Sequence, residues 1–454
     1  MALTTGVAGK APPLSSWPTY GGSLTSSNLV AARGLTLTAA KHMRVAWTRK
    51  VDGTVFAGPV IGASGAQRRV IVATEAGTVY ALNASNGTVV WSRSITKPVS
   101  ACGGSYGVTS APALDVAHRV VYAIGASGYL TALSLDDGSV RWRLRLVTRI
   151  TVEHVWSAVR LVGGSAYVAV ASYCDAPDKD KKPPDGYLLR VDLSRHRVTA
   201  KFDVVPGPDN LGGIWGWGGI SVDPATGAIF TSTGNSIVTS GGNLIEGAGH
   251  AERVLQLTPS LRVVDQTPTQ MTLAPENRGD EDFGATPLLF HPAGCPALVA
   301  ANSKNGYTYV WRRGGLSKSP VFDAKLGPTA TGDPFLGQPT YIPALHLLVI
   351  AQTVFGAGNP QRGISAYTIS SKCTFDRRWD LNIGGGPQAP PIAVGNLLVA
   401  SAPASHDVKL IDAKAGVIIA TLDPGQPVLA PLASDGRSIF AATTDGTITM
   451  YSPR

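Results

Sequence analysis

The chain reads ALNASNGTVVW at residues 81–91 and ALSLDDGSVRW at residues 132–142. Each stretch contains an Ala, a polar turn closed by Gly, and a Trp four residues after that Gly. Gly supplies the positive φ that such a hairpin turn needs, and the Trp can pack on a neighbouring unit. Self-similarity at a spacing of tens of residues in a chain rich in β patterns predicts a propeller.

Weaker copies of the strand that precedes this turn continue to the C-terminus. They begin at Thr78, Tyr129, Tyr187, Arg253, Tyr307, Ile364, Val408 and Thr447. The steps between them run from 39 to 66 residues, which is enough for four strands and a variable loop. The fold class we predict is therefore all-β, an eight-bladed β-propeller of four-stranded antiparallel blades.

The two ends of the sequence predict how the ring closes. The last copy, GTITMYSPR, stops before its Trp strand, whereas an isolated Trp strand, RVAWTRKV, stands at residues 44–51. Pairing this N-terminal strand into the last blade would remove both open sheet edges. We expect a flexible N-terminal segment at residues 1–16 and a single propeller at residues 17–454.

Composition narrows the class of protein. The formal net charge is +9, but Lys and Arg are scattered, so we expect no nucleic-acid partner. The sequence contains no run of 18 apolar residues, so it predicts no membrane span. The first ten residues, MALTTGVAGK, contain no apolar signal region, so the chain is either cytosolic or begins after a cleavage site. We expect a monomer.

Four cysteines, an even number, favour an oxidising compartment, and hence a periplasmic or secreted protein. Cys102 and Cys174 fall in neighbouring early blades, and Cys295 and Cys373 in consecutive later ones. We favour the pairs 102–174 and 295–373 among the three possible connectivities. Four buried free thiols are the alternative.

The Ala-Leu…Gly…Trp repeat resembles the tryptophan-docking repeat of the quinoprotein alcohol dehydrogenase-like propellers. Enzymes of that family bind pyrroloquinoline quinone (PQQ) and a calcium ion. The resemblance covers the chain from WPTYGG (17–22) onward. The same propeller also serves as a non-catalytic scaffold in outer-membrane protein assembly, so the repeat specifies the fold better than the function.

Residues 215–235, WGWGGISVDPATGAIFTSTGN, are similar to the family segment that carries a Trp beneath PQQ and a calcium-binding Asn. Alignment on the Asp-Pro pair selects Trp217 as that Trp, and alignment on the Trp-Gly-Trp phrase selects Trp215. The resemblance implies that Asn235 binds calcium. A flat aromatic face suits a planar quinone, although both Trp residues could instead pack between blades.

Residues 280–290, DEDFGATPLLF, resemble the family segment with the catalytic Asp, which implies that Asp282 is a general base and a metal ligand. Residues 304–310, KNGYTYV, resemble the phrase whose Lys contacts the reactive carbonyl oxygens of the cofactor, which points to Lys304. A solvated acidic turn and an ordinary hairpin lysine are the alternatives.

The other half of the expected site departs from the family pattern. Cys102 stands alone where the family has two adjacent cysteines followed by an Arg. Cys174 occupies the expected place of the calcium-binding Glu, with Asp175 one residue further on, and a Thr/Ser contact falls near Ser157. The resemblance thus implies Trp217, Lys304 and Ser157 for the cofactor, and Asn235, Asp175 and Asp282 for calcium. Donors to the cofactor carboxylates could come from Arg160, Arg253 or Arg278.

Two functions are consistent with these residues. The first is a divergent PQQ-dependent dehydrogenase that oxidises a secondary or polymeric alcohol, such as polyvinyl alcohol, by hydride transfer to a calcium-bound quinone. With no CxxCH haem motif, its electrons would pass to an external acceptor. The second is a non-catalytic propeller that binds a polymer, a glycan or a partner protein.

Overall fold

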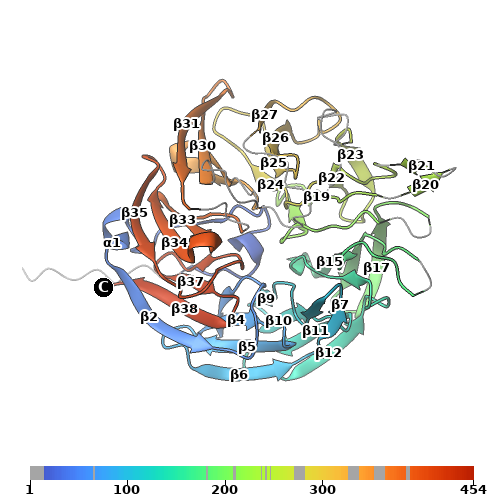
Figure 1. The fold of residues 1–454 in the computed structure, drawn as a ribbon, viewed down its shortest axis with the longest axis horizontal. Coiled ribbons are helices and arrows are strands. Elements are labelled where there is room, and N and C mark those ends of the chain that lie inside the picture. Colours follow the sequence, from blue (N-terminus) through green and yellow to red (C-terminus); the bar gives the residue numbers. More distant parts are fainter. Residues whose placement is uncertain are drawn as a thin grey trace, which may run out of the picture.

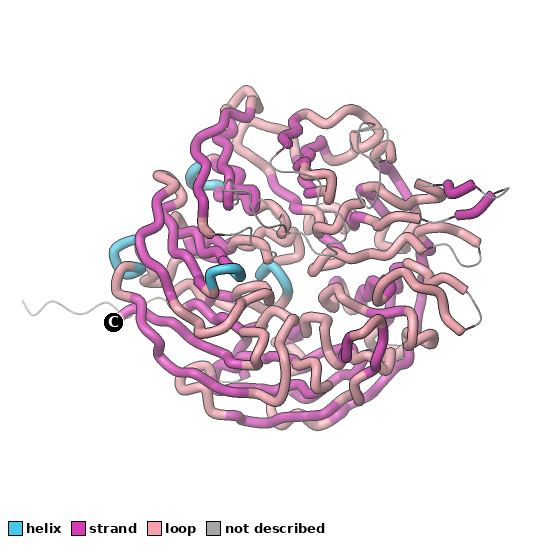
Figure 2. The backbone as a smooth tube through the Cα atoms, in the orientation of Figure 1, coloured by secondary structure: helices cyan, strands magenta, loops and turns pink. Residues whose placement is uncertain are grey.

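Eight antiparallel sheets surround a central axis in the computed structural model (Figure 1). It describes residues 15–64, 67–179, 182–207, 211–236, 238–240, 243–245, 247–269, 282–325, 337–351, 363–384 and 389–454. The described chain is almost entirely strand and loop (Figure 2). Its short helical segments are α1 (Leu37–Ala40), η1 (Tyr20–Gly22), η2 (Pro343–Leu345) and η3 (Pro403–Ser405).

Each blade runs from an inner strand to an outer strand. Blade one comprises β3 (Val60–Ser64), β4 (Gln67–Ala73), β5 (Thr78–Asn83) and β6 (Val89–Ser94), and blade two comprises β9 (Ala113–Asp115), β10 (Val120–Ile124), β11 (Tyr129–Ser134) and β12 (Val140–Arg145). Blade three comprises β13 (Glu153–His154) with β14 (Arg160–Val162), β15 (Ser165–Ser172), β16 (Tyr187–Asp192) and β17 (Arg197–Asp203). Blade four comprises β18 (Ile220–Val222), β19 (Ile229–Ser232), β22 (Val254–Leu257) and β23 (Val263–Gln266).

Blade five comprises β24 (Leu288–Phe290), β25 (Leu298–Asn302), β26 (Tyr307–Arg312) and β27 (Phe322–Lys325), and blade six comprises β28 (Thr340–Ile342), β29 (Leu347–Ala351), β30 (Gly363–Ile369) and β31 (Phe375–Asn382). Blade seven comprises β32 (Ile392–Val394), β33 (Leu397–Ala402), β34 (Asp407–Asp412) and β35 (Val417–Leu422). Blade eight comprises β36 (Ala433–Ser434), β37 (Ile439–Ala442), β38 (Thr447–Pro453) and β2 (Met43–Lys50). Small hairpins, β7 (Val99–Ala101) with β8 (Gly104–Tyr106) and β20 (Val238–Ser240) with β21 (Asn243–Ile245), project from the connections.

The predicted architecture is confirmed. The third strand of every blade begins within one residue of the start predicted from the repeat. Strand β2, which contains the isolated N-terminal Trp, pairs antiparallel with β38 and completes the last blade. Residues from both ends of the chain thereby share one sheet, and their apolar side chains share one core cluster.

Tryptophans of three outer strands contact the turn of the next blade. The Trp47 indole donates to the Ala84 carbonyl, 3.0 Å away, and covers Gly87. Gly87 has φ of +68°, and a Cβ there would lie 2.5 Å from the indole ring. Only Gly therefore satisfies both the turn and the close approach of the ring. The same contacts recur at Trp91 with Gly138 and at Trp379 with Gly416.

The N-terminal segment 15–33 lies along the inner strands of all eight blades, near the centre of the ring in Figure 1. Its hydrogen bonds follow the blades in order, starting and ending at blade eight: Ser15 with Asp435, Trp17 with Ile61, Pro18 with Leu114, Tyr20 with Arg160, Leu24 with Val222, Thr25 with Leu289, Ser26 with Gln338, Asn28 with Ala393, and Arg33 with Gly436. Strand β1 (Leu29–Val30) is the regular part of this contact, pairing parallel with β32. The sequence patterns did not predict this arrangement.

Arg160 is the strongest single anchor of that segment. Its side chain is completely buried, and its guanidinium donates to the carbonyls of Tyr20, Ser23 and Leu24. It also donates to the hydroxyls of Thr19 and Ser26. Burial lowers the pKa of Arg160 to about 10, which still leaves it charged at neutral pH.

Two disulfides join segments that are distant in sequence, as predicted. Cys102 bonds to Cys174, and Cys295 bonds to Cys373. The first links the connection before β9 to the loop after β15, and the second joins blades five and six. Residues 1–14 of the predicted flexible segment lie outside the described residues. Among the described helices, none has the length and apolar character that crossing a bilayer requires.

We predict that Arg160→Met destabilises the propeller by at least about 3 kcal/mol, because several buried oxygens lose their only charged donor. The measurement is the free energy of unfolding in a denaturant titration. Arg378→Met is the control, since Arg378 is exposed and its replacement by Met removes the same charge. Equal unfolding free energies for the two variants would contradict the anchoring role of Arg160.

Candidate functional site

All six predicted site residues lie in connections at one end of the ring, here called the funnel end. Within a blade, the connection before the first strand and the connection between the second and third strands emerge at the same end. Asp282, Ser157 and Trp217 precede inner strands. Lys304, Asn235 and Asp175 follow second strands. The opposite end, here called the turn end, carries the connections between strands one and two and between strands three and four.

Asp282 and Lys304 form a buried ion pair. The Lys304 ammonium lies 2.9 Å from Oδ1 of Asp282, and the two side chains are 5% and 0% exposed. The backbone N–H of Asn235 donates to Oδ2 of Asp282 at 3.3 Å. The Asp282 carboxylate thus has a donor on each oxygen, an ammonium on Oδ1 and a backbone N–H on Oδ2.

The repeat itself brings Asp282 and Lys304 together. The backbone N–H of Lys304 donates to the Asp282 carbonyl at 3.0 Å. The corresponding turn residues of blades one and eight, Glu75 and Thr444, donate in the same way to Thr54 and Pro427. A structural bond common to several blades therefore places two chemically distinctive side chains next to each other in blade five.

Trp215 is a tryptophan that lies beside Asp282. A Cβ added to Gly234 would lie 2.6 Å from Nε1 of Trp215 and 2.8 Å from Oδ2 of Asp282. The indole and the carboxylate therefore flank the same glycine. The Ser157 hydroxyl oxygen lies 3.1 Å from the Ile214 carbonyl oxygen and 2.8 Å from that of Gly216, so it holds the backbone on both sides of Trp215.

Trp217 packs in a different environment. It is 3% exposed and belongs to the core cluster that contains Tyr20, Val60 and Ala158. Its carbonyl accepts from the N–H of Ala158 at 2.8 Å. Of the two alignments that the sequence allows, the geometry beside Asp282 agrees with the one that selects Trp215.

Asp175 lies directly after the disulfide-bonded Cys174. Its backbone has a φ of +58°, and its Oδ1 accepts from the Ser172 hydroxyl at 2.6 Å. Across the described residues, no three His, Cys, Asp or Glu side chains converge in a group that could hold a metal ion. Two of the predicted calcium ligands, Asp282 and Asn235, are in contact through the Asn235 backbone N–H.

Trp215 belongs to a buried aromatic cluster. Trp156, Tyr173 and Trp215 pack together, with Tyr106 against them. The ring centroids of Tyr106 and Tyr173 are 4.8 Å apart, and those of His154 and Tyr173 are 4.5 Å apart. His154 is fully buried and its pKa is lowered to about 3, so it is a neutral ring at any physiological pH.

Glu75 is an acidic residue of this region that the sequence reasoning missed. It is 8% exposed; Oε2 accepts from the Gly107 N–H at 2.6 Å, and Oε1 has no hydrogen-bond partner among the described residues. Burial raises the pKa of Glu75 to about 7. The signal was present in the repeat, since TEAGTVY (74–80) aligns with SKNGYTY (303–309) and places Glu75 where Lys304 stands.

Two of the three candidate arginines, Arg160 and Arg253, are engaged elsewhere. Arg160 is committed to the N-terminal segment, and Arg253 donates to the Thr267 carbonyl at 2.7 Å. Arg278 lies outside the described residues. The charged donor that the structure places beside Asp282 is thus Lys304.

A family model described as outer membrane protein assembly factor BamB matches residues 13–174. The polyvinylalcohol dehydrogenase of a Pseudomonas species is 24% identical over 251 residues, covering 50% of this chain and 38% of that protein. The chain's match therefore spans well under half the length of this curated relative.

Solved structures match over nearly the whole chain. The quinohemoprotein alcohol dehydrogenase from Comamonas testosteroni superimposes with a TM-score of 0.75 at 14% identity, covering 98% of this chain and 81% of that chain. The chain has the propeller fold of the quinohemoprotein alcohol dehydrogenases. BamB from Moraxella catarrhalis, with a TM-score of 0.59 and 14% identity over 90% of this chain and 97% of that chain, is a more distant match. The predicted resemblance to PQQ-type propellers is confirmed.

We predict that Glu75 makes stability depend on pH. Because its pKa is about 7 in the folded protein and 4.5 when unperturbed, the folded state holds a proton that the unfolded state loses in this window. The contribution of Glu75 to the free energy of unfolding is therefore complete below pH 4.5 and falls by roughly 3 kcal/mol as the pH rises towards 7. Denaturant titrations of wild type and Glu75→Gln across this range measure the difference.

The exposed substitution Asp323→Asn is the control, and its difference from wild type should stay flat over the same range. A flat difference for Glu75→Gln as well would show that the Glu75 carboxyl titrates as an ordinary solvated acid.

Proposed function

We propose that this protein is a PQQ-dependent dehydrogenase that oxidises a secondary or polymeric alcohol at its funnel end and passes the electrons to an external acceptor. The observation that carries the proposal is the buried Asp282–Lys304 pair beside the Trp215 indole. A base, a fixed cation and a flat aromatic face are the parts that alcohol oxidation by a quinone requires.

The donor and aromatic groups at this site match the chemistry of a planar cofactor that bears carbonyl groups. Gly234 allows the Trp215 indole and the Asp282 carboxylate to approach each other closely, because a Cβ there would lie 2.6 Å from Nε1 of Trp215 and 2.8 Å from Oδ2 of Asp282. Trp215 offers a ring for stacking, in place of Trp217, and Lys304 offers a donor to a carbonyl oxygen. Asn235, Asp282 and Asp175 are the proposed calcium ligands. When bound, PQQ would accept the hydride that leaves the alcohol carbon.

Asp282 acts as the general base in this proposal. It takes the hydroxyl proton of the alcohol as the carbon–hydrogen bond breaks, so that the product leaves as a carbonyl compound. Lys304 balances the negative charge that develops on the cofactor side, without needing a proton from solvent. Ser157 positions Trp215 through the backbone that flanks the indole.

A secondary or polymeric alcohol is the proposed substrate class, because the curated relative is a polyvinylalcohol dehydrogenase. The two disulfides favour an oxidising compartment, so we assign the protein to the periplasm or to secretion. We propose that it acts as a monomer.

The second candidate function is a non-catalytic scaffold that binds a polymer, a glycan or a partner protein. It is favoured by the family model over residues 13–174 and by the altered Cys102 region. The two candidates differ in one measurable property, which is calcium-dependent binding of PQQ.

We predict one-to-one, calcium-dependent binding of PQQ in a calorimetric titration of chelator-treated protein. Trp215→Ala should weaken binding at least 10-fold, because stacking on the indole is lost. Asn235→Ala should remove the dependence on calcium. Trp217→Ala is the matched control, since that indole packs in the core between blades. An absence of binding by wild type with and without calcium would refute the dehydrogenase and favour the scaffold.

We predict that Asp282→Asn, assayed at saturating PQQ and calcium, lowers the rate of alcohol oxidation by roughly 10²- to 10⁴-fold, because the amide cannot accept the proton. The assay follows reduction of an artificial electron acceptor with 2-butanol and with polyvinyl alcohol. Asp323→Asn, on the exposed face of β27, should match wild type. Full activity of Asp282→Asn would remove Asp282 from the mechanism.

A further inference from the structure

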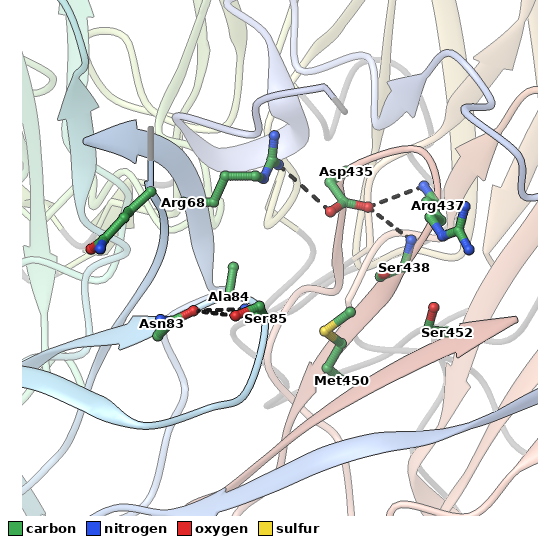
Figure 3. A pocket seen from close by; sticks show the side chains of 10 residues that line it. Arg68, Asn83, Ala84, Ser85, Asp435, Arg437, Ser438, Met450 and Ser452 are labelled. Atoms are coloured by element: carbon green, nitrogen blue, oxygen red, sulfur yellow. Dashed lines mark hydrogen bonds and ion pairs between the residues drawn. The ribbon is translucent and has the colours of Figure 1, made fainter. Parts of the chain in front are cut away.

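A cavity of about 590 Å³ lies between blade eight and blade one, where the ring closes. Eight of the ten residues that form its wall have polar or charged side chains: the wall comprises Gln67, Arg68, Asn83, Ala84, Ser85, Asp435, Arg437, Ser438, Met450 and Ser452. Figure 3 shows Arg68, Asp435 and Arg437 along one side and Asn83 with Ser85 opposite them.

This cavity belongs to the turn end of the propeller. Gln67 and Arg68 follow the connection between β3 and β4, and Asn83 and Ser85 lie at the connection between β5 and β6. Arg437 lies between β36 and β37. These are connections between strands one and two or three and four, so the cavity is at the end opposite Asp282 and Lys304.

The acceptor atoms in the wall are already engaged. Oε1 of Gln67 accepts from the Arg69 guanidinium at 2.6 Å. Oδ1 of Asn83 accepts from the N–H and the hydroxyl of Ser85. Asp435 accepts from the N–H groups of Arg437 and Ser438, and its other oxygen lies 3.6 Å from Arg68.

The donor atoms are not engaged in the same way. The Arg69 guanidinium and the Ser85 backbone N–H are donors, so each must face an oxygen and not an NH₂ group. Oε1 of Gln67 therefore faces Arg69, and Oδ1 of Asn83 faces Ser85. Within the described chain, nothing accepts from Nε2 of Gln67, from Nδ2 of Asn83, or from the exposed guanidinium of Arg437. The wall contains two guanidinium groups, of Arg68 and Arg437, and one carboxylate, of Asp435, so its formal charge is positive.

We propose that this cavity binds a small organic anion that carries several acceptor oxygens, as carboxylates or as a phosphate on a hydroxylated carbon chain. Arg437 meets the charged group, and the Gln67 and Asn83 amides donate to the remaining oxygens. Met450 and Ala84 provide an apolar wall for the carbon chain. A volume of 590 Å³ suits a molecule of tricarboxylate or sugar-phosphate size better than a bare inorganic ion.

The test is calorimetric titration of the full chain, at low ionic strength, with citrate and with glucose 6-phosphate. Inorganic phosphate and glucose are the comparison probes. We expect saturable one-to-one binding of citrate, glucose 6-phosphate or both, at least 10-fold tighter than phosphate, and no binding of glucose. Which organic anion binds distinguishes a carboxylate from a phosphate ligand.

Two variants locate the binding. Arg437→Glu reverses an exposed charge whose guanidinium has no hydrogen bond or ion pair within the described residues, and Asn83→Asp keeps the acceptor for Ser85 but replaces the amide donor by a carboxylate. Each should weaken binding at least 10-fold while leaving the melting temperature within a few degrees of wild type. Arg378→Glu, an exposed charge reversal in blade six, should bind as wild type does.

Three results would overturn the proposal. The first is that neither organic anion binds. The second is that inorganic phosphate binds as tightly as both organic anions. The third is that Arg437→Glu and Asn83→Asp bind with the affinity of Arg378→Glu. None of these outcomes depends on PQQ or on alcohol oxidation.

Discussion

Everything in this propeller depends on the contact between the N-terminal segment 15–33 and the eight inner strands. The inner strand is the edge of each blade's sheet, so its backbone groups that face the axis have no hydrogen-bond partner within the blade. The segment supplies hydrogen bonds to each blade in turn. Arg160 fastens it most firmly, since one buried guanidinium serves five oxygens of the segment. Strand β2 then continues the same stretch of chain into the last blade and closes the ring.

The funnel end shows how a repeat becomes a site. In several blades the turn after the second strand donates a backbone hydrogen bond to the connection that precedes the inner strand. This geometry is structural and is indifferent to the side chains. In blade five the two positions carry Lys304 and Asp282, which form an ion pair, and in blade one the turn carries the buried Glu75. The backbone of the repeat thus brings the two positions together, and the side chains at those positions determine what chemistry they can do.

Much of the fold could be predicted because its signals are local. The third strand of each blade is a copy of one repeated phrase, and this repeat located all eight strands within one residue. The isolated Trp of β2 and the truncated last repeat predicted closure. Cysteines in neighbouring blades predicted the disulfides. For the site, the resemblance located Asp282 and Lys304, but two residues of extra length near Trp215 and Trp217 left the alignment ambiguous.

The sequence alone determined the blade count, the strand positions and the closure, because each follows from a periodicity or an unmatched element along the chain. It favoured one pairing of the cysteines among three, and the structure contains that pairing. The tertiary structure alone decided which tryptophan lies beside Asp282, the use of Arg160 as an anchor, and the protonation of Glu75. It also created the cavity between blades eight and one. These properties depend on burial and on contacts between residues far apart in sequence, and neither is written in any local pattern.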